Sequence, residues 1–62
     1  MAKSEAAQFD FSVVRRLREQ RGLTLAELSA ASGVSVAVIS KLERNQQSAE
    51  LDTLYRLGRA FG

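Results

Sequence analysis

The 62-residue chain contains no cysteine, histidine, proline or tryptophan, and these absences exclude several classes of protein. Without cysteine there is no disulfide bond and no thiolate nucleophile, and without histidine there is no imidazole base. A zinc site of thiolate and imidazole ligands is excluded for the same reason. We therefore expect no catalytic residue, no metal site and no cofactor, and packing alone must hold the fold.

Long apolar runs are also missing. No run approaches the roughly 18 residues of a membrane span, and the N-terminus lacks the apolar core of a signal peptide, so we expect no membrane segment and a cytoplasmic location. The net charge of +2 is too small to identify a nucleic-acid binder, so the distribution of charge carries more information. An apolar content of 45% without proline favours a packed helical domain.

Residues 24–44 read T-L-A-E-L-S-A-A-S-G-V-S-V-A-V-I-S-K-L-E-R and contain two helix starts separated by a glycine. Thr24 followed by Glu27 forms a capping box, Gly33 can end the first helix in the left-handed region, and Ser35 can cap a second helix. Two short helices joined by such a turn are typical of a helix-turn-helix. The sequence therefore predicts this motif at about residues 25–44.

The second of these helices divides into two faces when its residues are placed at 100° intervals. One face is apolar except for a glutamate and comprises Ile39, Leu42 and Glu43, with Val38 at its margin. The other carries small side chains and two cations: Ala37, Ser40, Lys41 and Arg44. Such a slim face could enter a DNA major groove, although an ordinary amphipathic helix has a similar pattern. The paired caps, the glycine turn and the short helices favour the DNA-reading interpretation.

Helical periodicity continues on both sides of the motif. A first helix is expected from Asp10 or Ser12, its candidate caps, to Gly22. After a left-handed Asn45, a last helix is expected with Ser48 as its cap. Its expected inward residues are Leu51, Leu54, Leu57, Gly58 and Phe61, and the glycine would mark close approach of another helix. The sequence predicts an all-α, compact four-helix bundle over residues 10–62, with residues 1–9 as a flexible tail.

Three side chains have more than one interpretation. Arg18 and Glu43 would each lie at the edge of the core, where they could pair with each other or extend into solvent. Leu25 occupies the first position of its helix. It could be exposed, rest against a DNA backbone, or pack on a neighbouring part of the protein.

The run V-V-R-R-L-R-E-Q-R-G-L-T-L-A-E-L-S-A-A-S-G-V-S-V-A-V-I-S-K-L-E-R-N, followed by L-D-T-L-Y-R-L-G-R-A-F, resembles the Cro/lambda-repressor type of helix-turn-helix, the XRE family. The resemblance covers roughly residues 11–62. It implies a lambda-repressor-like bundle of four or five helices whose third helix reads the major groove.

The resemblance also implies roles for individual residues. Base-contacting positions fall on Val36, Ala37, Ser40 and Lys41. Phosphate-contacting positions fall on Thr24, Leu25, Ser35, Arg44, Asn45 and Gln46. The structural ion pair of the family falls on Arg18 and Glu43. The chain departs from the family at Leu25 (often Gln), Ser29 (usually Ala), Asn45 (usually Gly) and Ala49 (usually Pro). Because Val36 and Ala37 lack the amides that read adenine, base reading should depend on thymine methyl groups and on Lys41.

The leading functional hypothesis is sequence-specific binding of double-stranded operator DNA by a prokaryotic or phage transcriptional regulator, a repressor. The alternative is an antitoxin or a protein-interaction module with the same fold. Family members bind as dimers through a helix after Phe61 or through a later domain. We therefore expect a native homodimer but a monomeric or weakly dimeric 62-residue chain.

Overall fold

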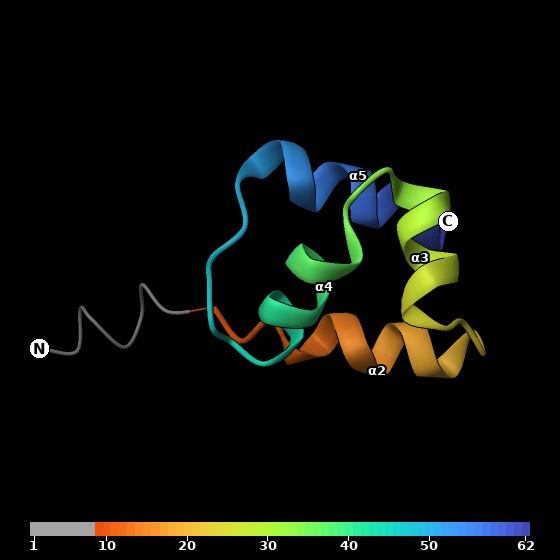
Figure 1. Cartoon of the computed structure of the whole chain (residues 1–62), viewed down its shortest axis with the longest axis horizontal. Coiled ribbons are helices and arrows are strands. Elements are labelled where there is room, and N and C mark those ends of the chain that lie inside the picture. The colour runs from red at the N-terminus through yellow and green to blue at the C-terminus, as the bar shows by residue number, and fades with distance from the viewer. Residues whose placement is uncertain (1–8) are drawn as a thin grey trace, which may run out of the picture.

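The computed structural model describes residues 9–62, and this part of the chain contains four helices and no strand. With the labels of Figure 1, the helices are α2 (Ser12–Gln20), α3 (Leu25–Ser32), α4 (Val36–Glu43) and α5 (Leu51–Phe61). The predicted all-α, four-helix fold is confirmed. Of the expected tail, only Phe9 lies within the described residues.

The helices are arranged around α4. Figure 1 shows α2 along one side of the molecule and α5 along the opposite side, with α4 between them and α3 at one end. Helix α3 packs against both α4 and α5, and α2 packs against α4. The chain turns by 115° between α3 and α4, within the range of about 90–120° for a helix-turn-helix. Among the described residues no single helix is long and apolar enough to cross a membrane; only α3 and α4 together, as a bent pair, meet that test by length and composition.

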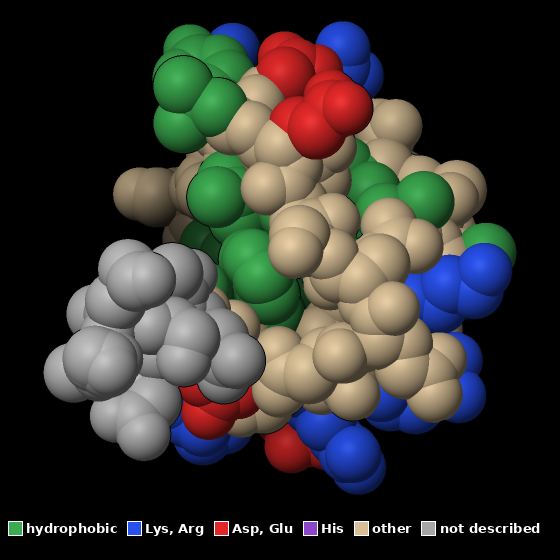
Figure 2. Space-filling model, turned by 90° about the vertical axis from the view of Figure 1, so that its left-hand side faces the viewer, with side chains coloured by type: hydrophobic (Ala, Val, Ile, Leu, Met, Phe, Trp, Pro, Cys, Tyr) green, Lys and Arg blue, Asp and Glu red, His purple; other side chains and the backbone are tan. Residues whose placement is uncertain are grey.

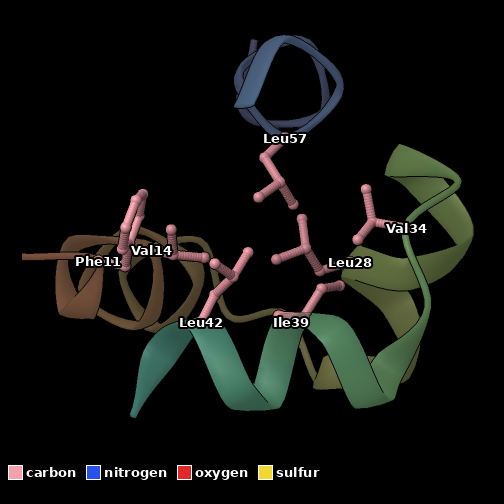
Figure 3. Close-up of a cluster of buried hydrophobic side chains, with 7 residues drawn as sticks. All are labelled: Phe11, Val14, Leu28, Val34, Ile39, Leu42 and Leu57. Carbon is pink, nitrogen blue, oxygen red and sulfur yellow. The ribbon is translucent and has the colours of Figure 1, made fainter. Parts of the chain in front are cut away.

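Every helix contributes to one apolar core, which Figure 3 shows in close-up. Leu28 of α3 and Ile39 and Leu42 of α4 are fully enclosed, each with 0% of its surface exposed. Four further buried side chains surround them: Phe11, Val14, Val34 and Leu57. Burying one such side chain stabilises the folded state by roughly 1.5–3 kcal/mol. The inner face of α4 is therefore held in place by residues from the other three helices and from the turn.

The predicted helix ends of the motif are confirmed. Thr24 and Glu27 form both hydrogen bonds of a capping box, and Gly33 ends α3 with a left-handed φ of 78°. The hydroxyl of Ser35 accepts a hydrogen bond from the backbone N–H of Val38 at 3.2 Å. Local sequence alone therefore fixes where α3 ends and α4 begins.

Three expectations for α5 are wrong. The helix begins after Glu50, without a side-chain cap, so Ser48 is not its cap. Leu51 is 84% exposed rather than inward, because six residues of helix place it about 120° around the axis from the buried Leu57. No heavy atom outside the local backbone would lie within 4 Å of a Cβ at Gly58, so no close helix approach requires this glycine.

Candidate nucleic-acid interface

The two faces of α4 differ as the helical wheel predicts. Ile39 and Leu42 are fully buried and Glu43 is 9% exposed. On the opposite face, Ala37, Lys41 and Arg44 are exposed, Val36 is 42% exposed, and Ser40 is partly buried. Helix α4 therefore presents a narrow row of small side chains that ends in two cations.

Arg18 of α2 and Glu43 of α4 are brought together in a bidentate ion pair. The Arg18 Nε donates to Glu43 Oε2 at 2.9 Å, and Nη2 donates to Oε1 at 3.1 Å. The remaining nitrogen, Nη1, donates to the carbonyl of Leu23 at 2.9 Å. The side chains are only 13% and 6% exposed, and the hydrogen bond to Glu43 raises the pKa of Arg18 above its ordinary value. This pair joins α4 both to α2 and to the segment that leads into α3.

The N-termini of α3 and α4 are each capped by a side-chain hydroxyl. Each hydroxyl accepts from only one of the backbone N–H groups that lack a partner within the helix. At α3, the N–H of Glu27 donates to Thr24 Oγ1 at 3.0 Å, and the N–H of Thr24 donates to Glu27 Oε1 at 2.8 Å. This box does not use the N–H groups of Leu25 and Ala26. Because helix N-termini carry partial positive charge, such donors suit an anionic oxygen.

Leu25 is half-buried and packs against the hydrophobic core. Of the three interpretations that the sequence allows, packing on the protein is therefore the one observed. Its side chain offers no donor to a phosphate, which leaves its backbone N–H as the polar group that could reach one.

The chain leaves α4 through a left-handed turn. Asn45 has a φ of 57°, the predicted left-handed conformation. Its N–H donates to the carbonyl of Leu42 at 2.9 Å, and the N–H of Gln46 donates to the carbonyl of Lys41 at 2.8 Å, which together form a Schellman motif. The side chains of Arg44 and Gln46, on either side of Asn45, are exposed.

The side chain of Asn45 contacts the start of α2. Its Oδ1 accepts from the N–H of Phe11 at 2.8 Å, and its Nδ2 donates to Asp10 Oδ1 at 2.9 Å. The same Asp10 oxygen accepts from the N–H of Ser12 at 3.0 Å. Of the two candidate caps, it is therefore Asp10 whose side chain accepts from a backbone N–H at the start of α2. The hydrogen bond from Asn45, followed by those from Ser12, lowers the pKa of Asp10 to about 2. Sequence reasoning missed this contact, and its only signal was an asparagine where the family usually has glycine.

Within the part of the chain that the structure describes, the cations on the outer face of α4 form no ion pair. Two other arginines form exposed ion pairs within their own helices, Arg15 with Glu19 and Arg56 with Asp52. Among the described residues, neither Lys41 nor Arg44 has such a partner. Arg44 instead donates from Nε to the carbonyl of Ser40 at 3.2 Å. No described carboxylate therefore competes with an anionic ligand for either cation.

Most of the large exposed apolar side chains lie away from the outer face of α4. Figure 2 shows apolar side chains reaching one face in separate groups, with Lys and Arg side chains at its upper, right and lower edges. Apart from Val36, the large exposed apolar residues are Phe9, Leu51 and Tyr55. They are contributed by the segment before α2 and by α5, so the outer face of α4 is not part of a large apolar surface.

Comparison with known proteins gives relatives of one kind. HTH-type transcriptional regulator SutR of Escherichia coli (strain K12) is 39% identical over 51 residues, which cover 82% of this chain and 29% of the relative. The uncharacterized HTH-type transcriptional regulator y4dJ of Sinorhizobium fredii is 45% identical over 47 residues, 76% of this chain and 61% of the relative. HTH-type transcriptional regulator DdrOP3 of Deinococcus deserti is 39% identical over 49 residues, 79% of this chain and 38% of the relative. No solved structure matches at a significant level.

The chain thus spans between 29% and 61% of the length of these relatives. A family model described as Helix-turn-helix matches residues 14–62, which include most of α2 and all of α3, α4 and α5. The matched segment includes the capping box, the glycine turn, and the buried inner face of α4 with its ion pair. The chain belongs to the XRE-type helix-turn-helix family of the Cro and lambda repressors.

Proposed function

We propose that this chain binds double-stranded DNA sequence-specifically, with α4 in the major groove, as part of a prokaryotic transcriptional repressor. The observation that carries the proposal is the outer face of α4, where small side chains lead to two cations that pair with no carboxylate among residues 9–62. The inner face is fully buried and the C-terminal end is tied to α2 by the Arg18–Glu43 pair. A rigid helix with this surface can enter a groove about 12 Å wide without steric conflict.

Base recognition is assigned to the outward residues of α4. Val36 and Ala37 can contact thymine methyl groups, and the Ser40 hydroxyl can donate to or accept from a base edge. Lys41 can donate to O6 and N7 of guanine, which is among the most frequent specific contacts in the major groove. All four side chains belong to the outward face or its margin.

Phosphate contacts are assigned to helix ends. The N-terminus of α3, with Thr24 and the backbone N–H of Leu25, can hold one phosphate, and the N-terminus of α4 at Ser35 can hold another. The exposed side chains of Arg44 and Gln46 can reach phosphates beyond the other end of α4. These contacts would orient α4 in the groove but carry no sequence information themselves.

Repression is the simplest outcome of such binding, because a protein on promoter DNA excludes the polymerase without any further contact. The native regulator is proposed to act as a homodimer on two half-sites one helical turn apart.

The 62-residue chain itself should be monomeric at micromolar concentration. A partner surface of about 800 Å² would require nearly a fifth of its 4310 Å² of accessible surface, and its exposed apolar residues are scattered. Sedimentation equilibrium tests this, and a concentration-independent dimer mass would refute it.

The experiment that tests DNA reading is a selection from a random duplex library, followed by affinity measurements by fluorescence anisotropy. We expect enrichment of a short motif that one half-site can hold. Wild-type protein should prefer that motif to scrambled DNA, and Lys41→Ala should lose part of the preference. Equal affinity of the wild type for all sequences would overturn the proposal of sequence-specific binding.

A protein-interaction module, such as an antitoxin, is the second candidate. It is favoured by the outer face of α5, where Leu51 and Tyr55, one helical turn apart, are 84% and 62% exposed. Co-purification with another small protein, abolished by Leu51→Ser together with Tyr55→Ser while DNA affinity is unchanged, would support this use of the fold. Retention of the partner by that double variant would count against α5 as the contact.

A further inference from the structure

The turn after α4 is joined directly to the start of α2, although the two segments are far apart in sequence. Figure 1 shows the chain that leaves α4 passing beside the first residues of α2. The contact consists of the two hydrogen bonds of the Asn45 side chain, to the N–H of Phe11 and to Asp10 Oδ1. Asp10 is in turn fixed by the N–H of Ser12.

These bonds leave Asn45 with few polar groups that could form a hydrogen bond to DNA. Its N–H is used by the carbonyl of Leu42, Oδ1 by Phe11, and one hydrogen of Nδ2 by Asp10. Its two neighbours differ, because Arg44 and Gln46 extend exposed side chains from the same turn. Because these bonds leave the Asn45 side chain a single Nδ2 hydrogen, its main effect on DNA binding is through the neighbours that it holds in position.

We propose that Asn45 is a positioning residue of the DNA-binding surface, which fixes Arg44 and Gln46 for phosphate contact by locking the turn after α4 onto the start of α2. The inference rests on the proposed function. Its physical basis is preorganisation, since a turn that is already ordered loses less conformational freedom on binding. Glycine at this position would adopt the same left-handed φ but would leave the turn without its attachment to α2.

The hydrogen-bond pattern has a direction that can be reversed. Residue 45 supplies the donor and residue 10 the acceptor of the bond between the two side chains. Asn45→Asp would place two carboxylates against each other and break this bond. Adding Asp10→Asn would restore a donor and an acceptor in the opposite order, with the net charge of the wild type. In the double variant, the new carboxylate at position 45 can still accept from the N–H of Phe11. The bond from Ser12 is not restored, because in the wild type a single Asp10 oxygen accepts from both Asn45 and Ser12, and an amide nitrogen in its place can only donate.

The experiment compares wild type, N45D, D10N and D10N/N45D in their affinity for a fluorescein-labelled duplex of random sequence at low salt. We expect N45D to bind about tenfold more weakly, and the double variant to recover part of this loss, because it restores the bond between residues 10 and 45 but not the one from Ser12. Amide hydrogen exchange at Phe11 should follow the same order, faster in N45D and slow again in D10N/N45D. N45G should exchange rapidly at Phe11 and bind weakly, and D10N should not rescue it.

Each other outcome overturns the assignment. If the double variant binds as weakly as N45D although Phe11 is protected again, residue 45 contacts the phosphate directly. If N45D and N45G bind as tightly as wild type, the attachment to α2 has no role in binding. A wild-type protein that binds no duplex at all would overturn the proposed function itself, and with it this role. Melting curves from circular dichroism establish that each variant is folded at the temperature of the assay.

Discussion

Helix α4 is built from two faces with opposite physical demands. On the inner face, Ile39 and Leu42 are completely buried, and Glu43 forms an ion pair with an arginine of another helix. The outer face exposes Ala37 and Lys41 and makes no ion pair among the described residues. The charge of the inner glutamate is thus paired within the protein, whereas Lys41 and Arg44 have no carboxylate partner among the described residues and can pair with a ligand.

This difference separates stability from recognition along a single helix of eight residues. Substitutions on the inner face should change the free energy of unfolding, and substitutions on the outer face should change DNA binding in a folded protein. The separation can be tested by substituting residues on one face at a time. Each substitution is compared with one at a position that differs in burial or in capping.

The largest effect is expected for Arg18→Ala or Glu43→Ala. Either substitution leaves a nearly buried charge without its partner, which costs roughly 3–5 kcal/mol when such a pair is fully buried. A single core of this size supplies only about 3–5 kcal/mol in total, so both variants should be largely unfolded at 25 °C. Urea denaturation monitored by circular dichroism measures the change.

The matched control for this ion pair is Arg15–Glu19, whose side chains are 62% and 55% exposed. Its removal should change the unfolding free energy by at most about 1 kcal/mol. A double-mutant cycle with a coupling energy near zero for Arg18 and Glu43 would show that burial does not strengthen the inner pair.

On the outer face, Lys41→Ala should weaken binding to the preferred sequence by roughly 1–3 kcal/mol and relax the preference at one base pair. Arg44→Ala should weaken binding about equally on all sequences and lower the salt slope by about one unit, because it is assigned to a phosphate. Anisotropy titrations at several salt concentrations distinguish the two results. Both variants should keep the wild-type melting temperature, and a large loss of stability would contradict the separation of the two faces.

A smaller effect is expected at the helix caps. Ser35→Ala removes the hydroxyl that accepts from the N–H of Val38, and loss of such a cap costs typically about 1 kcal/mol. Ser48→Ala is the matched control, since this serine is exposed and does not cap α5. Thermal unfolding of both variants should show a lower melting temperature only for Ser35→Ala. Equal losses would mean that Ser48 stabilises the start of α5 in another way.

The smallest effect concerns acid stability at the start of α2. The pKa of Asp10 is about 2 in the folded protein, against 3.8 for an unperturbed aspartate. The unfolded chain therefore binds the proton first as pH falls. The stabilising contribution of this carboxylate is present above pH 3.8 and is lost as pH falls toward 2. The difference in melting temperature between wild type and Asp10→Asn should shrink over that interval, and a constant difference would contradict the lowered pKa.

Local sequence determined the helix-turn-helix. The capping box at Thr24, the glycine at position 33 and the hydroxyl at Ser35 act within a few residues of themselves, so each helix end could be read directly. The periodicity of Ile39, Leu42 and Glu43 likewise fixed which face of α4 is buried. The left-handed conformation of Asn45 was also predictable, because asparagine tolerates a positive φ.

Only the tertiary structure decided which distant groups meet. The wheels placed Arg18 and Glu43 at the edge of the core but did not choose between pairing and exposure, and the packing of α2 on α4 brings them within 2.9 Å. Spacing alone misplaced Leu51, because leucines three residues apart shift steadily around a helix of 3.6 residues per turn, and the neighbouring helices cover only part of that helix. The Asn45 side chain reaches Phe11, 34 residues away, because the fold brings two chain segments together that no local pattern relates.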